Sequence, residues 1–163
     1  MTAIANKRVW LTGASSGIGL ALARQLADKG AKLILTSRRE AQLEELRRSL
    51  PTPDTHSVLA LDLSHPEKAK EKASSALASK TVDILINNAG VSQRSLAMET
   101  ELPVYRTLME VDYFSVVALN QVVLPQMVER SSGHIVTVSS VAGKVGTKLR
   151  SGYSGAKFAV IGY

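Results

Sequence analysis

Residues 8–39 read RVWLTGASSGIGLALARQLADKGAKLILTSRR: an apolar run, a glycine-rich turn, a helical pattern and a second apolar run. The apolar runs 8–12 and 32–37 have the length and the Val, Ile and Leu content of buried strands. Between them, apolar residues recur every three or four positions along 17–29, which predicts a helix. A strand, a crossover helix and a second strand form a βαβ unit with parallel strands.

The same alternation continues along the rest of the chain. Three further apolar runs predict strands at 57–61, 82–86 and 134–139. Because the runs are nearly continuous, we expect both faces of every strand to be buried. Helical patterns fill the intervals at 40–50, 66–79 and 101–130, and a last helix contains Tyr153. The long helix is predicted to be interrupted at Pro125. This order predicts an α/β fold with a doubly wound parallel sheet in a single domain, residues 1–163.

Composition excludes several classes of site. The 163 residues are 45% hydrophobic, enough for one domain with a core. The absence of cysteine excludes disulfides, thiol catalysis and Cys-ligated metals. The three histidines are scattered, so we expect no metal. A chain without cysteine suits a reducing compartment, and we expect a cytoplasmic protein.

The net charge of +6 raises the question of a nucleic-acid partner. The positive residues are spread in short pairs and only 4% of residues are aromatic, so we expect no nucleic-acid binding. No targeting segment or membrane anchor is visible at the polar start of the chain. The most apolar segment, 111–128, contains several polar residues and is interpreted as a buried amphipathic helix.

The glycine-rich turn has the spacing GxxxGxG. Gly13 would allow the tight turn, Gly17 would let the backbone approach a pyrophosphate, and Gly19 would let the helix pack close to the strand. The helix N-terminus adds free N–H groups and a positive dipole end. We therefore expect dinucleotide phosphates to bind at Gly13, Ser15, Ser16, Gly17, Ile18 and Gly19. An ordinary strand–helix turn is the alternative. A P-loop nucleotidase is disfavoured because no Gly-Lys-[Ser/Thr] ends the turn.

The end of the second predicted strand bears on the choice of cofactor. An NAD-binding fold usually has an acidic residue here, which binds the ribose 2′-hydroxyl. This chain has Ser37, Arg38 and Arg39 instead. Two guanidinium groups would bind a 2′-phosphate, so the sequence predicts NADP. The alternative is that both arginines simply precede a helix.

Tyr153 and Lys157 are four residues apart on a predicted helix and therefore share a face. An ammonium beside a tyrosine favours the phenolate, which would let Tyr153 exchange a proton with a carbonyl or hydroxyl oxygen. Ser140 ends the fifth predicted strand, where ligands of such sheets lie. Each feature alone has a plain alternative, an exposed helix pair or a serine that satisfies its own turn.

Together these residues resemble the short-chain dehydrogenases/reductases. Residues 12–19 match the TGxxxGIG loop of that family, Asp62-Leu63 its adenine-pocket pair, and 87–90 its NNAG motif. Ser140 and the Tyr153-x-x-x-Lys157 pair match its catalytic residues in order and spacing. The resemblance extends over 7–163.

The resemblance implies a Rossmann fold with three α/β/α layers and hydride transfer between NADP(H) and an alcohol or carbonyl carbon. It implies that Tyr153 is the acid/base and also contacts the cofactor, and that Ser140 polarises the substrate oxygen. It implies that Lys157 lowers the pKa of Tyr153 and holds the nicotinamide ribose. The cofactor would be bound further by Asp62, Leu63, Asn88, Ala89 and Gly90. Family members continue with further strands and helices, so we expect the C-terminal part of this domain to be missing from the 163 residues.

Asp112 departs from the family pattern, because it occupies the place of a fourth catalytic residue, an asparagine. An ionised carboxylate only accepts hydrogen bonds, and its charge near Lys157 would weaken the effect of that lysine on Tyr153. A role of the backbone carbonyl at this position would survive the change. We expect reduced or retuned activity rather than none.

The loop before Tyr153 contains Lys144, Lys148 and Arg150. It suggests a preference for anionic or carrier-linked carbonyl substrates, the alternative being a solvated basic loop. A non-catalytic dinucleotide-binding or interaction module is the alternative to an enzyme. The family resemblance also implies a homodimer or homotetramer formed through the long helices.

Overall fold

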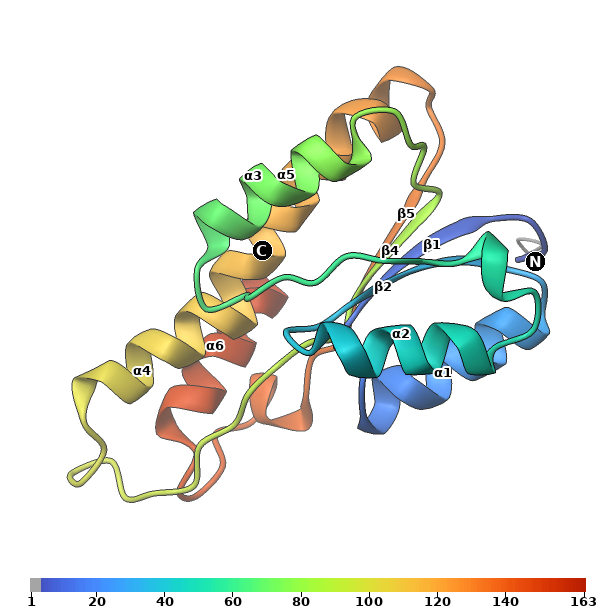
Figure 1. Cartoon of the computed structure of the whole chain (residues 1–163). Coiled ribbons are helices and arrows are strands. Elements are labelled where there is room, and N and C mark those ends of the chain that lie inside the picture. Colours follow the sequence, from blue (N-terminus) through green and yellow to red (C-terminus); the bar gives the residue numbers. More distant parts are fainter. Residues whose placement is uncertain (1–3) are drawn as a thin grey trace.

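The core of the fold is a five-stranded parallel sheet in the order β3-β2-β1-β4-β5. The computed structural model describes residues 4–163. The strands are β1 Arg8–Thr12, β2 Lys32–Thr36, β3 Ser57–Val58, β4 Ile84–Asn87 and β5 His134–Thr137. The chain starts at the central strand, winds to one edge and then crosses to the other (Figure 1). This confirms the doubly wound α/β fold of the Rossmann type.

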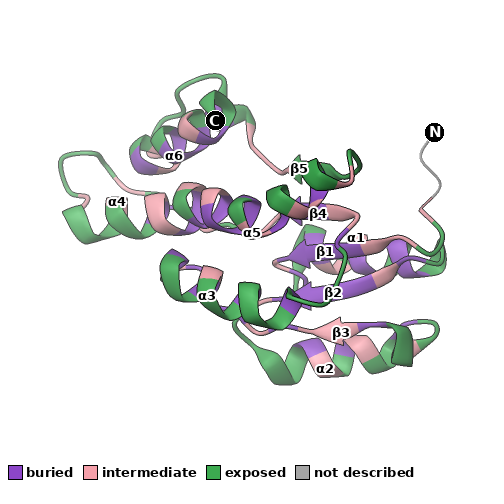
Figure 2. Ribbon diagram, turned by 90° about the horizontal axis from the view of Figure 1, so that it is seen from above, coloured by how far each residue is buried: buried purple, intermediate pink, exposed green. Residues whose placement is uncertain are grey.

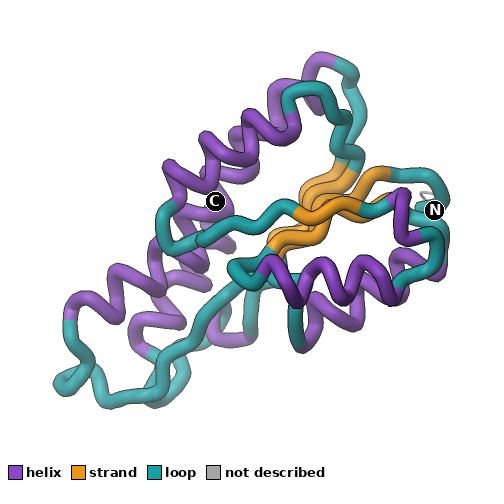
Figure 3. Tube along the Cα trace, viewed as in Figure 1, coloured by secondary structure: helices purple, strands orange, loops and turns teal. Residues whose placement is uncertain are grey.

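Helices cover both faces of the sheet (Figures 1 and 3). On one face lie α1 Gly17–Asp28 and α2 Glu40–Ser49, and on the other lie α3 Pro66–Leu77 and α5 Ser115–Glu129. The remaining helices, α4 Leu102–Met109 and α6 Ser151–Gly162, pack against each other. Adjacent residues of β1 point to opposite cores. Val9 and Leu11 pack with α1 and α2, whereas Trp10 packs with α3 and α5. The three layers follow from this alternation, because each inner strand buries both of its faces.

The sheet edges differ from the prediction that every strand is buried on both faces. Along β5 exposed and half-buried residues alternate, and Val136 is 47% exposed. The third strand covers two residues rather than the predicted 57–61. Its extended backbone nevertheless continues to pair with β2, because Leu59 N–H donates to the Leu35 carbonyl. Burial on both faces therefore holds for the inner strands after their first residue and fails at the edges (Figure 2).

The long helix is interrupted at a different place from the one predicted. Pro125 lies inside α5 and does not end it. Gln121, whose carbonyl lacks a backbone donor because of the proline, and Pro125 are both exposed residues, so water can satisfy that carbonyl. The interruption is instead a π turn at Glu110–Phe114, between α4 and α5. It contains Asp112.

By length and composition, Leu102–Glu129 could cross a membrane. Half of its most apolar window is buried inside the protein, where Leu119 and Val123 pack in the core formed with α3. That burial favours the interpretation as an amphipathic core helix.

Candidate functional site

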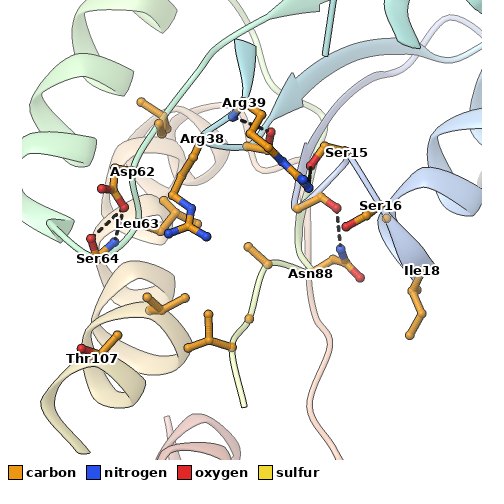
Figure 4. Close-up of a pocket in the computed structure, with 18 residues that line it drawn as sticks. Ser15, Ser16, Ile18, Arg38, Arg39, Asp62, Leu63, Ser64, Asn88 and Thr107 are labelled. Atoms are coloured by element: carbon orange, nitrogen blue, oxygen red, sulfur yellow. Dashed lines mark hydrogen bonds between the residues drawn. The ribbon is translucent and has the colours of Figure 1, made fainter. Parts of the chain in front are cut away.

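A cavity of about 350 Å³ opens at the carboxyl ends of β1, β2 and β4 (Figure 4). Parallel strands end at the same edge, so loops distant in sequence meet there. The cavity is lined by Gly13, Ser15, Ser16, Ile18, Gly19, Ser37, Arg38, Arg39, Leu61, Asp62, Leu63, Ser64, Asn88, Ala89, Gly90, Val91, Thr107 and Val111. It therefore collects every predicted cofactor residue except Gly17, Tyr153 and Lys157.

The first wall of the cavity is the glycine-rich turn. Gly13 and Gly17 have φ of +68° and +54°, values that residues with a Cβ rarely adopt. A Cβ on Gly19 would lie 2.1 Å from the Gly13 carbonyl oxygen, so α1 packs directly on the turn. A Cβ on Gly17 would meet nothing within 4 Å, which leaves its backbone accessible. These contacts fit the role predicted for each glycine.

The NNAG segment is bonded to this turn through one buried threonine. Thr12 Oγ1 accepts hydrogen bonds from the N–H groups of Asn88 and Ala89, each at 3.0 Å. The Asn88 side-chain amide donates to the Thr12 carbonyl at 2.9 Å. Two of the predicted cofactor segments are thus fixed to one another at the ends of β1 and β4.

The two arginines differ in their contacts. Arg39 precedes α2 and donates to Ser15 Oγ at 3.1 Å, and its backbone N–H donates to Ser37 Oγ at 3.2 Å. The Arg38 side chain projects into the cavity from the end of β2 (Figure 4). The cavity therefore has one anchored and one projecting guanidinium group at its β2 side.

Asp62 lies across the cavity from these arginines (Figure 4). Its carboxylate accepts from the hydroxyl of Ser64 at 2.7 Å and from the N–H of Ser64 at 3.0 Å. These hydrogen bonds, helped by charge from His65 and Arg38, hold the pKa of Asp62 below its usual value. Leu63 is buried beside it. Asp62 thus presents a fixed, ionised acceptor.

A second cluster adjoins the cavity at Gly90. Lys157, 5% exposed, donates to the Val138 carbonyl at 3.3 Å, and its Nζ lies 4.0 Å from Asp112 Oδ1. A Cβ on Gly90 would lie 2.9 Å from Asp112 Oδ1 and 3.5 Å from Lys157 Nζ. The Lys157 ammonium is 5.7 Å from the centroid of the Tyr153 ring. Three of the four predicted catalytic residues therefore form one cluster.

Ser140 connects to this cluster through a short turn. Its hydroxyl oxygen accepts the Ala142 N–H at 3.1 Å and caps the 3-10 turn Val141–Gly143. A Cβ on Gly143 would lie 2.7 Å from the Lys157 carbonyl oxygen, so the turn packs on α6. The hydroxyl satisfies its own turn, as the alternative interpretation expected. It keeps its proton for donation, because only its oxygen is engaged.

Asp112 is fully buried in the π turn. Its Oδ1 accepts the Val91 N–H at 2.9 Å, whereas Oδ2 has no partner among the described residues. Burial raises the pKa of Asp112 to about 6, although Lys157 and the Val91 hydrogen bond oppose the shift. The carboxylate thus changes charge near neutral pH.

This raised pKa predicts a pH-dependent stability. Because the folded state holds the Asp112 proton more tightly than the unfolded state, stability falls as pH rises from about 4 to about 6. Asp112→Asn keeps the acceptor for Val91. Above this pH range its free energy of unfolding is expected to exceed that of the parent by about 2–3 kcal/mol, and below the range the two values should be equal. Urea unfolding at several pH values measures the difference. Glu110→Gln, in the same turn, is the control, and a pH-independent difference between Asp112→Asn and the parent would contradict the assignment.

Sequence reasoning missed some of the residues that line the cavity. These are Leu61, Ser64, Val91, Thr107 and Val111. Ser64 carried a usable signal, because a serine two residues after an aspartate often bonds back to it. Thr107 carried none, because only the packing of α4 brings it to the cavity. In the described part of the chain, no group of three His, Asp or Glu side chains could hold a metal ion.

The model of the short chain dehydrogenase family matches residues 7–163. The chain belongs to this family. It is 45% identical over 163 residues to human dehydrogenase/reductase SDR family member 7, covering 95% of this chain and 48% of that protein. It is 43% identical to mouse SDR family member 7B, covering 94% of this chain and 50% of that protein. The chain thus spans about half the length of these relatives.

Solved structures of short-chain dehydrogenases have the same fold. One from Streptomyces avermitilis has a TM-score of 0.89 and 36% identity, covering 95% of this chain and 57% of its own. A gluconate 5-dehydrogenase from Burkholderia cenocepacia, in complex with NADP and tartrate, has a TM-score of 0.87 and 29% identity, with 96% and 62% covered. A Burkholderia phymatum enzyme in complex with NAD has a TM-score of 0.90 and 28% identity, with 99% and 59% covered. Structural relatives thus include both NADP and NAD complexes.

Proposed function

We propose that this short-chain dehydrogenase is an NADP(H)-dependent oxidoreductase that interconverts an alcohol and a carbonyl group. The observation that carries the proposal is the junction at Gly90. The same glycine lines the cavity and lies against Asp112 and Lys157. A dinucleotide in the cavity would therefore reach the cluster that contains Tyr153.

The residues present fit a dinucleotide. The accessible backbone at Gly17 and the start of α1 would hold the pyrophosphate, and Asp62 with Leu63 would hold the adenine. Arg38 and Arg39 would bind a 2′-phosphate. Lys157 would hold the nicotinamide ribose. When bound, the nicotinamide would supply hydride to a carbonyl carbon or accept it from an alcohol carbon.

The chain's own residues would handle the proton. Tyr153 Oη donates it to the substrate oxygen in reduction and takes it back in oxidation. The Lys157 ammonium, 5.7 Å from the ring centroid, would supply a positive charge next to the tyrosine as it gives up the proton. Ser140 donates its hydroxyl proton to the substrate oxygen, because its oxygen already accepts from Ala142.

The cofactor proposal is tested at the arginine pair. Replacing Arg38 and Arg39 together by alanine is expected to reduce the preference for NADPH over NADH by about 10- to 100-fold, because charge-assisted hydrogen bonds to a phosphate are lost. The ratio of kcat/KM for the two cofactors measures it. Arg48→Ala, which removes an exposed charge from the following helix α2, is the control. A parent protein that prefers NADH would overturn the NADP proposal. Dinucleotide binding without turnover of any carbonyl compound would favour a non-catalytic module.

We also propose self-association through α5 and α6. Phe114, Phe158 and Ile161 are 45–47% exposed on and next to these helices, which supports an apolar contact between copies. Sedimentation velocity of the protein tests it, and a monomer at all concentrations would reject it.

A further inference from the structure

Arg150 is held beside Tyr153 by contacts to a second loop. Its guanidinium group donates to Ser92 Oγ, and its Cζ lies 5.8 Å from the centroid of the Tyr153 ring. The two loops are also joined by a backbone hydrogen bond, in which Ser95 N–H donates to the Leu149 carbonyl at 3.1 Å. Arg150 as a residue is half-buried, and its contact with Ser92 lies at the exposed surface, so the guanidinium group is held in position and remains accessible to a ligand.

The two segments that meet at Arg150 contain basic residues and no acidic ones, whereas the neighbouring segment 99–112 carries Glu99, Glu101, Glu110 and Asp112. Neither 84–98 nor 130–163 contains an aspartate or a glutamate. Within residues 4–163, no carboxylate forms an ion pair with Arg150. The buried carboxylate of this region, Asp112, faces Lys157 and Val91 instead. Among the described residues, the Arg150 charge therefore has no carboxylate partner.

A positioned guanidinium group that has no carboxylate partner keeps its donors for an anionic ligand. Arg150 uses one of its N–H groups on a neutral hydroxyl, which leaves donors in the fork geometry that matches a carboxylate. Its neighbour Lys148 differs, because it is exposed and lines a separate apolar cavity between 95–97 and 147–151. Of these two basic residues of the loop, Arg150 is therefore the one placed to bind a substrate next to Tyr153.

We propose that Arg150 binds the carboxylate of the substrate, so that this site selects carbonyl or alcohol compounds that carry a carboxylate group. The inference rests on the proposed oxidoreductase function. It names a substrate class that the motifs do not, and it makes Arg150 a specificity-determining residue. The guanidinium is close enough to Tyr153 for one small molecule to present its carbonyl oxygen to the phenol and its carboxylate to the arginine.

The experiment compares 5-oxohexanoate with its methyl ester, which has the same ketone and no charge. The measured quantity is the ratio of their kcat/KM values with NADPH. The parent is expected to favour the acid at least tenfold, and Arg150→Gln to lower the ratio by about 10- to 100-fold, mainly through KM of the acid. Arg150→Lys is expected to restore part of it, and Lys148→Gln to leave it unchanged.

Binding without turnover separates this inference from the proposed function. Calorimetry in the presence of NADP⁺ gives the Kd of each compound without turnover, because the oxidised cofactor has no hydride to give to the ketone. Tighter binding of the acid that is lost in Arg150→Gln and kept in Lys148→Gln supports the inference even if no turnover occurs. Equal binding of acid and ester by the parent, or an unchanged acid Kd in Arg150→Gln, overturns it. Turnover of the ester alone would reject the substrate class and leave the oxidoreductase function intact.

Discussion

Tyr153→Phe is expected to lower kcat for carbonyl reduction by about 10²- to 10⁴-fold, the usual contribution of a positioned general acid. Phenylalanine retains the ring near the Arg150 and Lys157 cations and removes only the hydroxyl that transfers the proton. Because the ring is half-buried and its packing is unchanged, NADPH affinity and folding should be close to those of the parent. Steady-state loss of NADPH absorbance measures kcat, and fluorescence titration measures cofactor binding.

Tyr105→Phe is a matched control for this change. The Tyr105 hydroxyl bonds to Ser151 Oγ at 2.9 Å and therefore links α4 to the start of α6. Its removal is expected to cost about 1 kcal/mol of stability and to leave proton transfer in place. If Tyr153→Phe retained kcat within tenfold, another group would be the proton donor and the catalytic assignment would fall.

Gly19→Ala is expected to destabilise the protein by at least about 3 kcal/mol and to abolish dinucleotide binding at micromolar concentration. The added Cβ would stand 2.1 Å from the Gly13 carbonyl oxygen and 2.7 Å from its carbon, both backbone atoms. The start of α1 must then move away from the turn, and the Asn88 amide, 2.6 Å from the same Cβ, must move too. Urea unfolding and calorimetric titration with NADPH measure the two losses.

Gly155→Ala provides the comparison within the same protein. Gly155 lies inside α6, and a Cβ there would meet nothing within 4 Å. Alanine should therefore stabilise by up to about 1 kcal/mol, the difference in helix propensity. Equal behaviour of the two variants would show that the close packing of α1 on the turn carries no energy.

The order of helices and strands was predictable because each type of element has its own pattern of apolar residues. Nearly continuous apolar runs marked the inner strands, and apolar residues three or four apart marked α1 and α3. The edges were less predictable, since a run such as 134–139 has the same composition whether or not a layer covers it. The π turn was not predictable from pattern, because the apolar residues around it suit an uninterrupted helix and Pro125 was the stronger local signal.

The candidate site also has a part that was predictable from the sequence and a part that was not. Its cofactor residues follow motifs with fixed positions at strand ends, so the sequence placed Gly13, Arg38, Asp62 and Asn88 around one cavity. Sequence gave no distance between Lys148, Arg150 and Tyr153, since that depends on how two loops meet. The structure distinguishes the two cations, one beside the tyrosine ring and one on another cavity.

The π turn also sets the tolerance of the long helix to changes in length. A π turn holds one residue more than regular α-helix, and each residue of α-helix turns the chain by about 100°. Val111 and Asp112, neighbours in sequence, are both buried there. Deleting one residue of 110–114 would permit a regular helix, and α5 would remain on the sheet through Leu119 and Val123. Everything before the deletion would then rotate, and the carboxylate would no longer stand opposite Lys157. Helix content and core packing would survive, but the cofactor cavity and the cluster around Tyr153 would no longer be correctly oriented to one another. Circular dichroism would not detect this loss.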